Sequence, residues 1–440
     1  MLKNKKRIAA SLLTGMVLVT SVLPGMCTKA AAATVDTEFR KQLTAQGFPK
    51  SYLTPLETLH KSYPEWEFEA VDTGLEWKTV LEKESKNGVN LVPKSVDDSK
   101  KSTAEGAYDW EKNTWTIYDG SSWVAAHPDY IAYYMDPRNF LNDTDIFQFE
   151  NLGYSSSQKE KGVKAILAST FMAKSVKDTD GKTLNYAKTF MKIGKLVSVS
   201  PYHLASRVRQ EQGLNGNSSM ISGTYKGYEG YFNYFNVGAA GVSSSKVLRK
   251  GLTYAKNAGW DSRYKSLKGG AQIIAKNYIA VGQDTLYFQK FNVVNKKNLY
   301  SHQYMGNLTA AYTEGRKMGQ GYSDKHQTFV FRIPVYKNMP AKAVTFTRTG
   351  SPNNYIKSLK VSGKTLTPAF SGAVKTYSLV LPDTSSITIT AVPVHAKAKL
   401  TLTGPKKLKK GKNTFKIICR SENGKKRTYT LNVSCTAQKK

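Results

Sequence analysis

The hydrophobic periodicity of the chain changes near Val344, and this change restricts the fold more than any other feature. Upstream, the segments 162–174 and 186–195 carry apolar residues at the three- and four-residue spacing of helices. Downstream, short runs alternate apolar and polar residues, which is typical of strands with one buried face. These runs are 355–361, 376–381, 386–392, 399–402, 413–419 and 427–433. The sequence therefore predicts a mainly helical α+β domain followed by a small antiparallel all-β sandwich.

The 440 residues are enough for two or three domains. The alternation of Trp66, Phe68 and Ala70 predicts a strand, and the segment 75–84 has a helical pattern. We expect this N-terminal α+β region to pack on the helical domain or to be part of it. The expected order is a signal at 1–33, the α+β region at 34–150, the helical domain at 151–333, a linker at 334–343 and the sandwich at 344–440.

The first 33 residues have the three parts of a secretory signal peptide. The cations Lys3, Lys5, Lys6 and Arg7 precede an apolar run, and the alanines at 30–33 offer a cleavage site. A retained membrane anchor is the alternative, but the run is short and contains hydroxyl residues. No other run approaches the roughly 20 apolar residues of a membrane helix. The sequence thus predicts a secreted, extracellular protein without a membrane span once the signal is removed.

The formal net charge of +33 exceeds what solubility requires and indicates a polyanionic partner. Nucleic acid is one such partner, but an exported protein first meets anionic wall polymers and phospholipid head groups. The segment 397–440 contains fourteen lysines and arginines and a single acid, Glu422. We therefore expect an anionic wall polymer as the partner and no nucleic acid. The alternative is that the lysines only cover solvated faces.

Two cysteines remain after signal removal, Cys419 and Cys435, and both fall in a predicted hairpin that turns at 423–424. In that register Cys435 lies about seven residues beyond the position opposite Cys419, or roughly 24 Å at strand rise. A disulfide tolerates only about 7 Å between Cα atoms. We therefore expect two free thiols.

The segment PYHLASRVRQEQG at 201–213 is a predicted helix that begins at Ser200 and Pro201 and ends at Gly213. Its glutamate, Glu211, is spaced to share one helical face with Leu204 and Val208.

Glu211 is the candidate general acid, because a carboxyl on a buried face at the last turn of a helix is disfavoured in its ionised form by desolvation and by the helix dipole. A protonated carboxyl near neutral pH is what donation to a glycosidic oxygen requires. The alternative is a glutamate that turns to solvent or pairs with Arg207.

The stretch GYEGYFNYFNVGA at 227–239 is rich in aromatic rings and asparagine. Flat aromatic faces stack on sugar rings, and asparagine amides match hydroxyl and acetamido groups. The composition predicts a carbohydrate groove beside Glu211, and a packed tyrosine-rich loop is the alternative. The candidate substrate-binding residues here are Tyr228, Tyr231, Phe232, Asn233, Phe235 and Asn236.

Five ordered segments resemble exported clostridial β-N-acetylglucosaminidases of glycoside hydrolase family 73. They are YYMDPRNFL from Tyr133, SPYHLASRVRQEQG from Ser200, ISGTYKGYEGYFNYFNVGA from Ile221, GQDTLYFQKFNV from Gly282 and HQYMGN from His302. The resemblance implies a lysozyme-like, mainly helical catalytic domain with a small β lobe. It also implies hydrolysis of the β-1,4 bond on the reducing side of N-acetylglucosamine in peptidoglycan glycan strands.

Carried over position by position, the resemblance places the family's catalytic glutamate at Glu211. The family's tyrosine segment falls on 284–290 and nominates Tyr287 as a substrate-binding residue, while Asn236 stands as an extra residue before the glycine of the aromatic motif. The second catalytic acid matches less well. Glu229 ranks first and Asp261 second, and the acetamido group of the substrate is a further candidate.

The C-terminal strands resemble the cadherin-like β-sandwich module of exported bacterial proteins, through IKSLKVSGKTLTPAFSGAVKTYSLVLP from Ile356 and NTFKIICRSENGKKRTYTLNVS from Asn413. Modules of this kind are spacers or adhesive units. Together with its charge, this implies that the sandwich holds the protein on teichoic acid, and it predicts a cell-wall-associated location.

Three functions remain open from the sequence: a glucosaminidase, a muramidase or lytic transglycosylase on a related scaffold, and a wall-binding protein without catalysis. The six histidines, among them His203 and His302, form no ligand-spaced cluster with cysteines or carboxylates. The sequence therefore predicts no metal and no cofactor.

Overall fold

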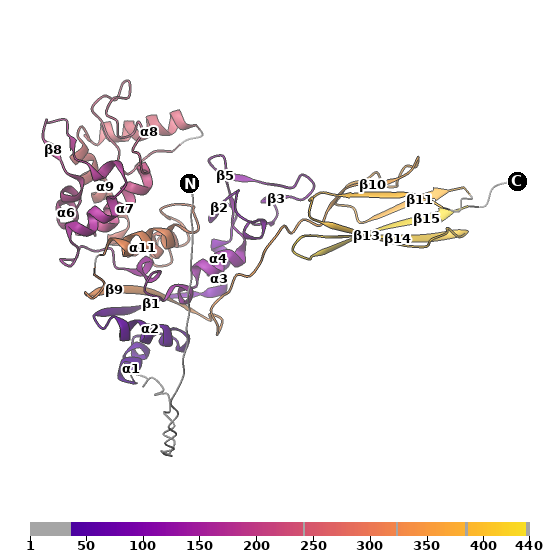
Figure 1. The fold of residues 1–440 in the computed structure, drawn as a ribbon, viewed down its shortest axis with the longest axis horizontal. Helices are drawn as coiled ribbons and strands as arrows, with labels where there is room; N and C mark the ends of the chain where they lie inside the picture. The colour runs from indigo at the N-terminus through magenta and orange to yellow at the C-terminus, as the bar shows by residue number, and fades with distance from the viewer. Residues whose placement is uncertain (1–36, 241–242, 323, 383–385, 437–440) are drawn as a thin grey trace, which may run out of the picture.

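The computed structural model describes residues 37–240, 243–322, 324–382 and 386–436. Figure 1 shows a mixed body of helices and short sheets, from which an elongated β sandwich projects to one side. The predicted fold class, a mainly helical α+β domain followed by an all-β sandwich, is confirmed. The predicted signal peptide lies outside the described residues. Within them, no helix is both long and apolar enough to cross a bilayer.

Two strands from opposite ends of the body pair in parallel. β1 (Trp66–Glu76) lies beside β9 (Phe329–Lys337), with Trp66 opposite Phe329. Helices α1 (Thr37–Ala45) and α2 (Lys50–Ser62) lie on one side of this pair and α11 (Ala310–Gly321) on the other (Figure 1). One hydrophobic core runs from the first helix through β9. The N-terminal region is therefore part of the same folded unit as the helices that follow.

The helical part contains the predicted helix at its centre, as α7 (Pro201–Gln212). The Ser200 hydroxyl accepts a hydrogen bond from the His203 amide, and Gly213 ends the helix with φ +68°. The helix predicted at 162–174 ends early, at Leu167, because the backbone leaves the helical conformation at Ala168 (ψ 140°) and continues through Ser169 with φ +61°. Around α7 stand α5 (Glu160–Leu167), α6 (Tyr186–Val197), α8 (Ser244–Asn257), α9 (Arg263–Asn277) and α10 (Leu286–Lys290).

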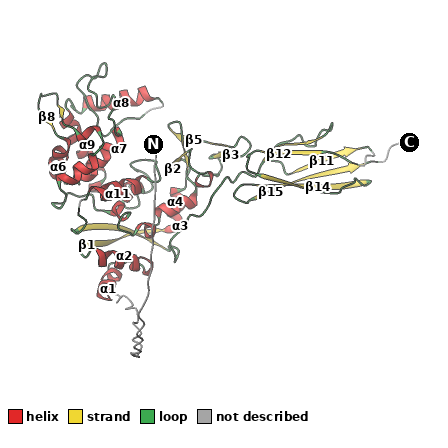
Figure 2. Cartoon of the chain, viewed as in Figure 1, coloured by secondary structure: helices red, strands yellow, loops and turns green. Residues whose placement is uncertain are grey.

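A small lobe between α3 (Trp77–Glu84) and α4 (Pro128–Met135) carries short strands (Figure 2). Its three-stranded antiparallel sheet has the order β2-β6-β5, and a separate hairpin is formed by β3 and β4. The strands are β2 (Leu91–Pro93), β3 (Tyr108–Asp109), β4 (Thr114–Trp115), β5 (Ile117–Asp119) and β6 (Trp123–Ala125). The remaining short elements of the body are β7 (Val176–Lys177), β8 (Thr183–Leu184), η1 (Asp98–Lys100), η2 (Pro137–Phe140), η3 (Ile146–Phe149), η4 (Phe171–Ala173) and η5 (Ile279–Val281).

The sandwich has its own core and two sheets, with the orders β10-β12 and β11-β15-β14-β13. β11 and β15 run parallel, so the prediction of a purely antiparallel sandwich is wrong. The reason is that the chain passes to the other sheet after β11, which leaves β11 beside the last strand. The strands are β10 (Ile356–Val361), β11 (Thr376–Leu381), β12 (Ile389–Pro393), β13 (Lys399–Thr403), β14 (Gly411–Arg420) and β15 (Lys426–Cys435).

The two cysteines are free and buried, as predicted. In the β14–β15 hairpin Cys419 lies opposite Arg427, whereas Cys435 lies opposite Gly411 at the far end of the ladder. The register therefore keeps the two sulfur atoms apart.

The linker predicted at 334–343 is wrong in its position. Residues 334–337 belong to β9, which pairs with β1, and residues 334–336 are buried. The chain that follows is also held, because Arg138 donates to the carbonyl oxygens of Pro340 (2.7 Å) and Lys342 (3.1 Å). The Val344 amide donates to Asp136 at 2.9 Å. The connection is therefore hydrogen-bonded to the body and is not a free linker.

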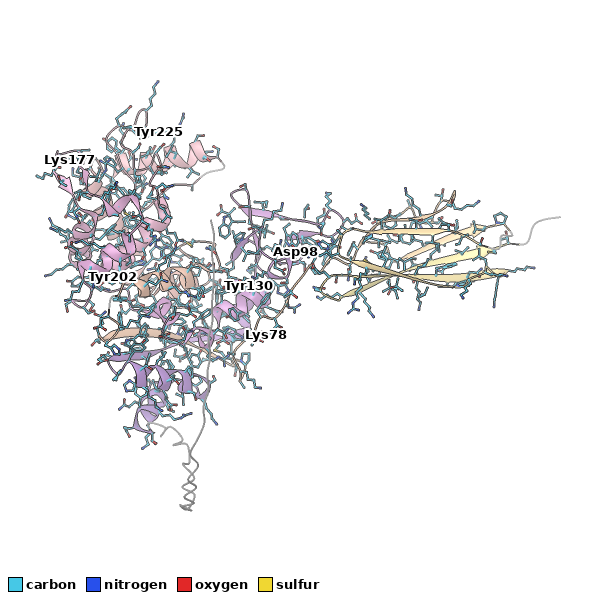
Figure 3. The ribbon with its side chains drawn as sticks, in the orientation of Figure 1. Lys78, Asp98, Tyr130, Lys177, Tyr202 and Tyr225 are labelled. Atoms are coloured by element: carbon cyan, nitrogen blue, oxygen red, sulfur yellow. The ribbon has the colours of Figure 1, made fainter. Side chains whose placement is uncertain are left out.

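The sandwich is fastened to the small lobe by polar and aromatic contacts. The buried Asn353 amide donates to the Tyr108 hydroxyl (2.7 Å) and to the Trp110 carbonyl (2.9 Å). The Trp110 ring stacks on Tyr355 with 5.4 Å between centroids. Figure 3 labels Asp98 at this junction, where its carboxylate lies 3.9 Å from the His395 ring. The sandwich is therefore attached to the small lobe through a defined set of side-chain contacts.

Candidate active site

A cavity of about 1070 Å³ lies between the tip of the β5–β6 hairpin and the helices α8 and α9. Figure 1 shows this hairpin and α8 on the same side of the molecule. Hairpin residues 119–121 line one side of the cavity, and the inward face of α8 and one face of α9 line another. Glu211, Tyr304 and Asn236 are among the polar residues that line the cavity between them. The cavity has the size and the mixed polar and apolar lining of a ligand site.

Glu211 reaches the cavity from the last turn of α7. Leu204 and Val208 on the same helical face are fully buried, whereas Glu211 is half-buried because its carboxylate faces the cavity. Both of its oxygens are hydrogen-bonded: the Tyr304 hydroxyl donates to Oε1 at 2.9 Å, and the Asn236 amide donates to Oε2 at 2.9 Å. The carboxylate is therefore held in one orientation.

Asn236 is oriented by a second amide. The Gln212 side chain donates to Asn236 Oδ1 at 3.1 Å, which leaves the amide nitrogen of Asn236 to face Glu211. Asn236 has φ +51°, a conformation that asparagine adopts more readily than most other residues. Asn236, the extra residue before the glycine of the aromatic motif, thus contacts the candidate acid directly.

Tyr304 is fixed from behind by a buried cation. The Arg207 guanidinium lies over its ring at 3.2 Å from the centroid, and Tyr278 meets the ring edge-on at 5.7 Å. The Tyr304 amide donates to the Gln289 carbonyl at 3.0 Å. Burial, with the Glu211 charge opposing the effect of Arg207, keeps the pKa of Tyr304 well above its usual value. The phenol is therefore a permanent donor to Glu211 at physiological pH.

Arg207 pairs with another acid, not with Glu211. Its guanidinium contacts Glu314 Oε1 at 3.2 Å and donates to Gln289 Oε1 at 2.9 Å, and both charged side chains are buried. Burial raises the pKa of Glu314, although Arg207 opposes that rise. The alternative prediction, an Arg207–Glu211 pair, is wrong. The guanidinium lies against the Tyr304 ring and binds Glu314 and Gln289 instead.

The segment before and after Tyr304 is held by buried polar groups. Gln303 accepts a hydrogen bond from Lys290 at 2.9 Å and donates to both carboxylate oxygens of Glu84 at 3.0 and 2.8 Å. Burial lowers the pKa of Lys290 to about 8 and raises that of Glu84. Leu91 in the small lobe exchanges backbone hydrogen bonds with Gly306 and Leu308. The segment thus ties the small lobe to the helices.

The aromatic stretch divides into cavity residues and packing residues. Phe235 and Asn236 line the cavity with Glu211, and their role in binding substrate stays a prediction. Phe232 and Asn233 are buried, and the Asn233 amide holds the loop by donating to the carbonyls of Val237 and Gly251. The prediction that Phe232 and Asn233 contact the substrate is wrong, because the protein encloses both side chains.

Tyr228 and Tyr231 face the outer side of α8. The Tyr228 hydroxyl is hydrogen-bonded to Thr253 at 2.8 Å, and Lys256 lies about 6 Å from both ring centroids. Neither tyrosine lines the cavity that contains Glu211. Their predicted role in substrate binding there has no support from this geometry.

Tyr287 was predicted to bind substrate but is fully buried in α10. Its hydroxyl donates to the Met135 carbonyl at 2.5 Å and is 2.7 Å from the Tyr336 hydroxyl. The prediction is wrong because α10 turns this residue toward the core. The tyrosine that reaches the carboxylate is Tyr304, which lies in the HQYMGN segment and which the motif alone did not single out.

The two predicted second acids also lie away from the cavity. The exposed Glu229 carboxylate accepts a hydrogen bond from the Gly227 amide of its own loop at 3.0 Å, and Asp261 pairs with Lys265 at 2.8 Å. The residues that line the cavity include two carboxylates, Glu211 and Asp119. Asp119 comes from the β5–β6 hairpin of the small lobe, which sequence spacing around Glu211 does not indicate.

Metal ligands do not gather anywhere in the described part of the chain: no group of three or more histidine, cysteine, aspartate or glutamate side chains there is arranged to hold an ion. The polar groups of the cavity are oxygens and amides, which suit a neutral hydroxyl-rich ligand.

Comparison with known proteins gives one family match and several similar proteins. Residues 356–434 match the family described as cadherin-like beta sandwich domain. A bifunctional autolysin of Staphylococcus epidermidis is 28% identical over 222 residues, which are 49% of this chain and 16% of that protein. A beta-N-acetylglucosaminidase of Bacillus subtilis (strain 168) is 30% identical over 222 residues, which are 49% of this chain and 23% of that protein. The chain thus spans less than a quarter of either relative.

Among solved structures, glucosaminidase B of Staphylococcus aureus is 21% identical with a TM-score of 0.42, over 62% of this chain and 94% of that chain. The resemblance drawn from the sequence is confirmed: this chain is similar to glucosaminidase-type autolysins, and its C-terminal strands are similar to the cadherin-like sandwich.

Proposed function

We propose that the protein is a peptidoglycan hydrolase that cleaves the β-1,4 bond on the reducing side of N-acetylglucosamine. The observation that carries the proposal is Glu211, whose carboxylate faces a large cavity and is held by Tyr304 and Asn236. The similarity to an autolysin and to a beta-N-acetylglucosaminidase supports the substrate class.

Glu211 acts as the general acid in this proposal. Glycoside hydrolysis needs a carboxylic acid that protonates the leaving oxygen as the glycosidic bond breaks. Tyr304 and Asn236 hold the carboxyl in a fixed orientation, so that little reorganisation is needed when the glycan is bound. Phe235, in the wall of the same cavity, offers an apolar surface to a sugar ring.

Asp119 replaces Glu229 and Asp261 as the candidate second carboxylate. Its place in the cavity wall, on an element opposite the helices, supports a role in activating water or in stabilising the positive charge that develops on the sugar ring. The acetamido group of the substrate is the alternative, because it also supplies a nucleophilic oxygen near the reacting carbon.

The sandwich is proposed to hold the enzyme on anionic wall polymers such as teichoic acid. The outer face of β14 carries Lys412, Lys416 and Arg420, all exposed. Cations on a solvent-facing sheet attract a phosphodiester chain without a shaped pocket. A secreted, wall-associated location follows from this proposal and from the predicted signal peptide.

Digestion of purified peptidoglycan tests the function. Zymography shows whether the wall is hydrolysed, and mass spectrometry of the products shows the bond. Reducing N-acetylglucosamine ends are expected; reducing N-acetylmuramic acid ends identify a muramidase, and anhydro ends a lytic transglycosylase. Wall binding without any product identifies a non-catalytic protein.

A further inference from the structure

Helix α8 separates two depressions of the surface. Its inward residues, among them Val247 and Leu248, line the cavity that contains Glu211. Its outward residues line a shallow groove of about 620 Å³, together with Gly238. The stretch 237–239 borders both, since Val237 and Ala239 line the cavity and Gly238 lines the groove. A ligand in the cavity is therefore one helix away from the groove.

The groove is lined by one face of α8. The lining residues on α8 are Ser245, Lys246, Arg249, Lys250, Thr253, Tyr254 and Asn257, which follow helical spacing, and all seven are exposed. Three cations occupy the first half of this face, and α8 contains no acidic residue. The Tyr254 ring, 37% exposed, continues the floor of the groove toward Gly238.

Among the residues that the structure describes, the three cations have no acidic partner. Within the described ranges, the side chains of Lys246, Arg249 and Lys250 form no ion pair and no hydrogen bond, although the backbone N–H of Lys246 donates to the Ser243 hydroxyl. Some lysines on other helices are paired locally, as Lys164 with Glu160 and Lys265 with Asp261, whereas the α6 lysines Lys188, Lys192 and Lys195 form no ion pair within the described ranges. Three adjacent unpaired cations repel one another, so an anion bound among them gains from all three.

We propose that this groove is a subsite for an anionic group attached to the wall glycan, a carboxylate or a phosphate, while the glycan itself occupies the cavity. The inference rests on the proposed function. Lysine and arginine both pair with carboxylates and phosphates, and the arginine fork matches their two oxygens. Thr253 and Asn257 lie farther along the same face and offer hydrogen bonds to the polar chain that bears the anion. Peptide stems supply carboxylates, and anionic wall polymers supply phosphates.

The triple substitution Lys246→Gln, Arg249→Gln and Lys250→Gln tests the proposal in the full chain. A matched control is Lys188→Gln, Lys192→Gln and Lys195→Gln on α6, which removes the same charge from exposed positions outside both depressions. Both are placed in a Glu211→Gln background, so that binding is measured without turnover. The probes are soluble glycan fragments that carry peptide stems only, a phosphate polymer only, or neither.

The triple variant is expected to bind at least one of the two charged fragments about three- to tenfold more weakly than the control, with a smaller dependence on salt, because exposed ion pairs contribute modestly and are screened. Binding of the bare glycan should not change. Weaker binding of the stem fragment by the triple variant identifies a carboxylate as the ligand of the groove. Weaker binding of the polymer fragment identifies a phosphate. The inference is overturned if the triple variant and the control bind both charged fragments equally well. It is also overturned if the triple variant loses as much affinity for the bare glycan as for the charged fragments.

The same series separates this inference from the proposed function. If the wild-type protein hydrolyses wall glycan but the triple variant binds every fragment as the control does, only the groove assignment falls. If the wild type neither binds nor hydrolyses any glycan, both proposals fall.

Discussion

The Tyr304 hydroxyl donates to Glu211 Oε1 at 2.9 Å, although the two residues are 93 positions apart. The tyrosine is held by Arg207 beneath its ring and by the backbone of Gln289. The candidate acid is therefore oriented by a part of the chain that folds against it from a distance.

Replacing Glu211 with glutamine should remove hydrolysis while glycan binding survives, because the amide keeps the size and polarity but has no proton to transfer. Turnover should fall by at least about 10²–10⁴-fold, the range that acid–base catalysis contributes. The measurement is the release of reducing ends from soluble glycan. Glu229→Gln, an exposed acid outside the cavity, is the control and should keep wild-type turnover. Wild-type turnover by the Glu211 variant would exclude it as the acid.

Replacing Tyr304 with phenylalanine should lower kcat by about ten- to a hundredfold with little change in KM, because a hydrogen bond to a charged group contributes about 1.5–3 kcal/mol. The ring and its contact with Arg207 remain, so the fold should be kept. Tyr287→Phe is the matched control: it removes a buried hydroxyl with two partners and should lower the melting temperature without lowering kcat. Equal kcat losses in both variants would assign Tyr304 a structural role only.

Replacing Asp119 with asparagine should lower kcat by about tenfold or more if this carboxylate activates water or stabilises the sugar cation. NMR of the first product then gives its anomeric configuration, and inversion is expected for a water-activating base. Asp261→Asn, whose carboxylate pairs with Lys265 on the surface, should have no effect. An active Asp119 variant with a retained anomer would point to the acetamido group instead.

Stability should decrease between pH 5 and pH 8 because of Glu150. Burial raises the pKa of this carboxyl from 4.5 to about 8, with hydrogen bonds from Tyr322 and Gln158 opposing the rise. Because the folded-state pKa is above the unfolded one, the contribution is full below about pH 4.5 and is lost as the pH rises through 8. One pKa unit corresponds to about 1.4 kcal/mol, so the effect on the free energy of unfolding amounts to a few kcal/mol.

Urea unfolding at several pH values, followed by tryptophan fluorescence, measures this effect. Glu150→Gln should flatten the slope between pH 5 and pH 8, since glutamine does not titrate. A variant with the wild-type slope would show that other groups dominate this pH range.

Replacing Lys412, Lys416 and Arg420 with glutamine should weaken the binding of intact walls and leave hydrolysis of soluble fragments unchanged. These side chains lie on the outer face of β14, in a sandwich whose core is separate from that of the body. Co-sedimentation with walls at low and high salt measures the effect, which should shrink with salt. Equal binding to walls stripped of anionic polymers would contradict the proposed anchor.

The sequence was sufficient wherever the determining contacts are local. Ser200, Pro201 and Gly213 set the ends of α7, and the spacing of Leu204, Val208 and Glu211 gave the face they share. Alternating residues likewise placed the strands of the sandwich, and hairpin register placed the two cysteines apart. These features depend on backbone capping, side-chain periodicity and turn chemistry, which act within a few residues.

Only the tertiary structure decided which distant groups meet Glu211. Tyr287 and Tyr304 are both tyrosines in aromatic segments, and packing against Met135 buries one while Arg207 aims the other at the carboxylate. Asp119 enters the cavity because a hairpin of the small lobe folds against the helices. The first part of the predicted linker, residues 334–337, belongs to β9 because β1, far away in the chain, pairs with it. Such contacts depend on how separate elements pack together, and no local periodicity or cap specifies that packing.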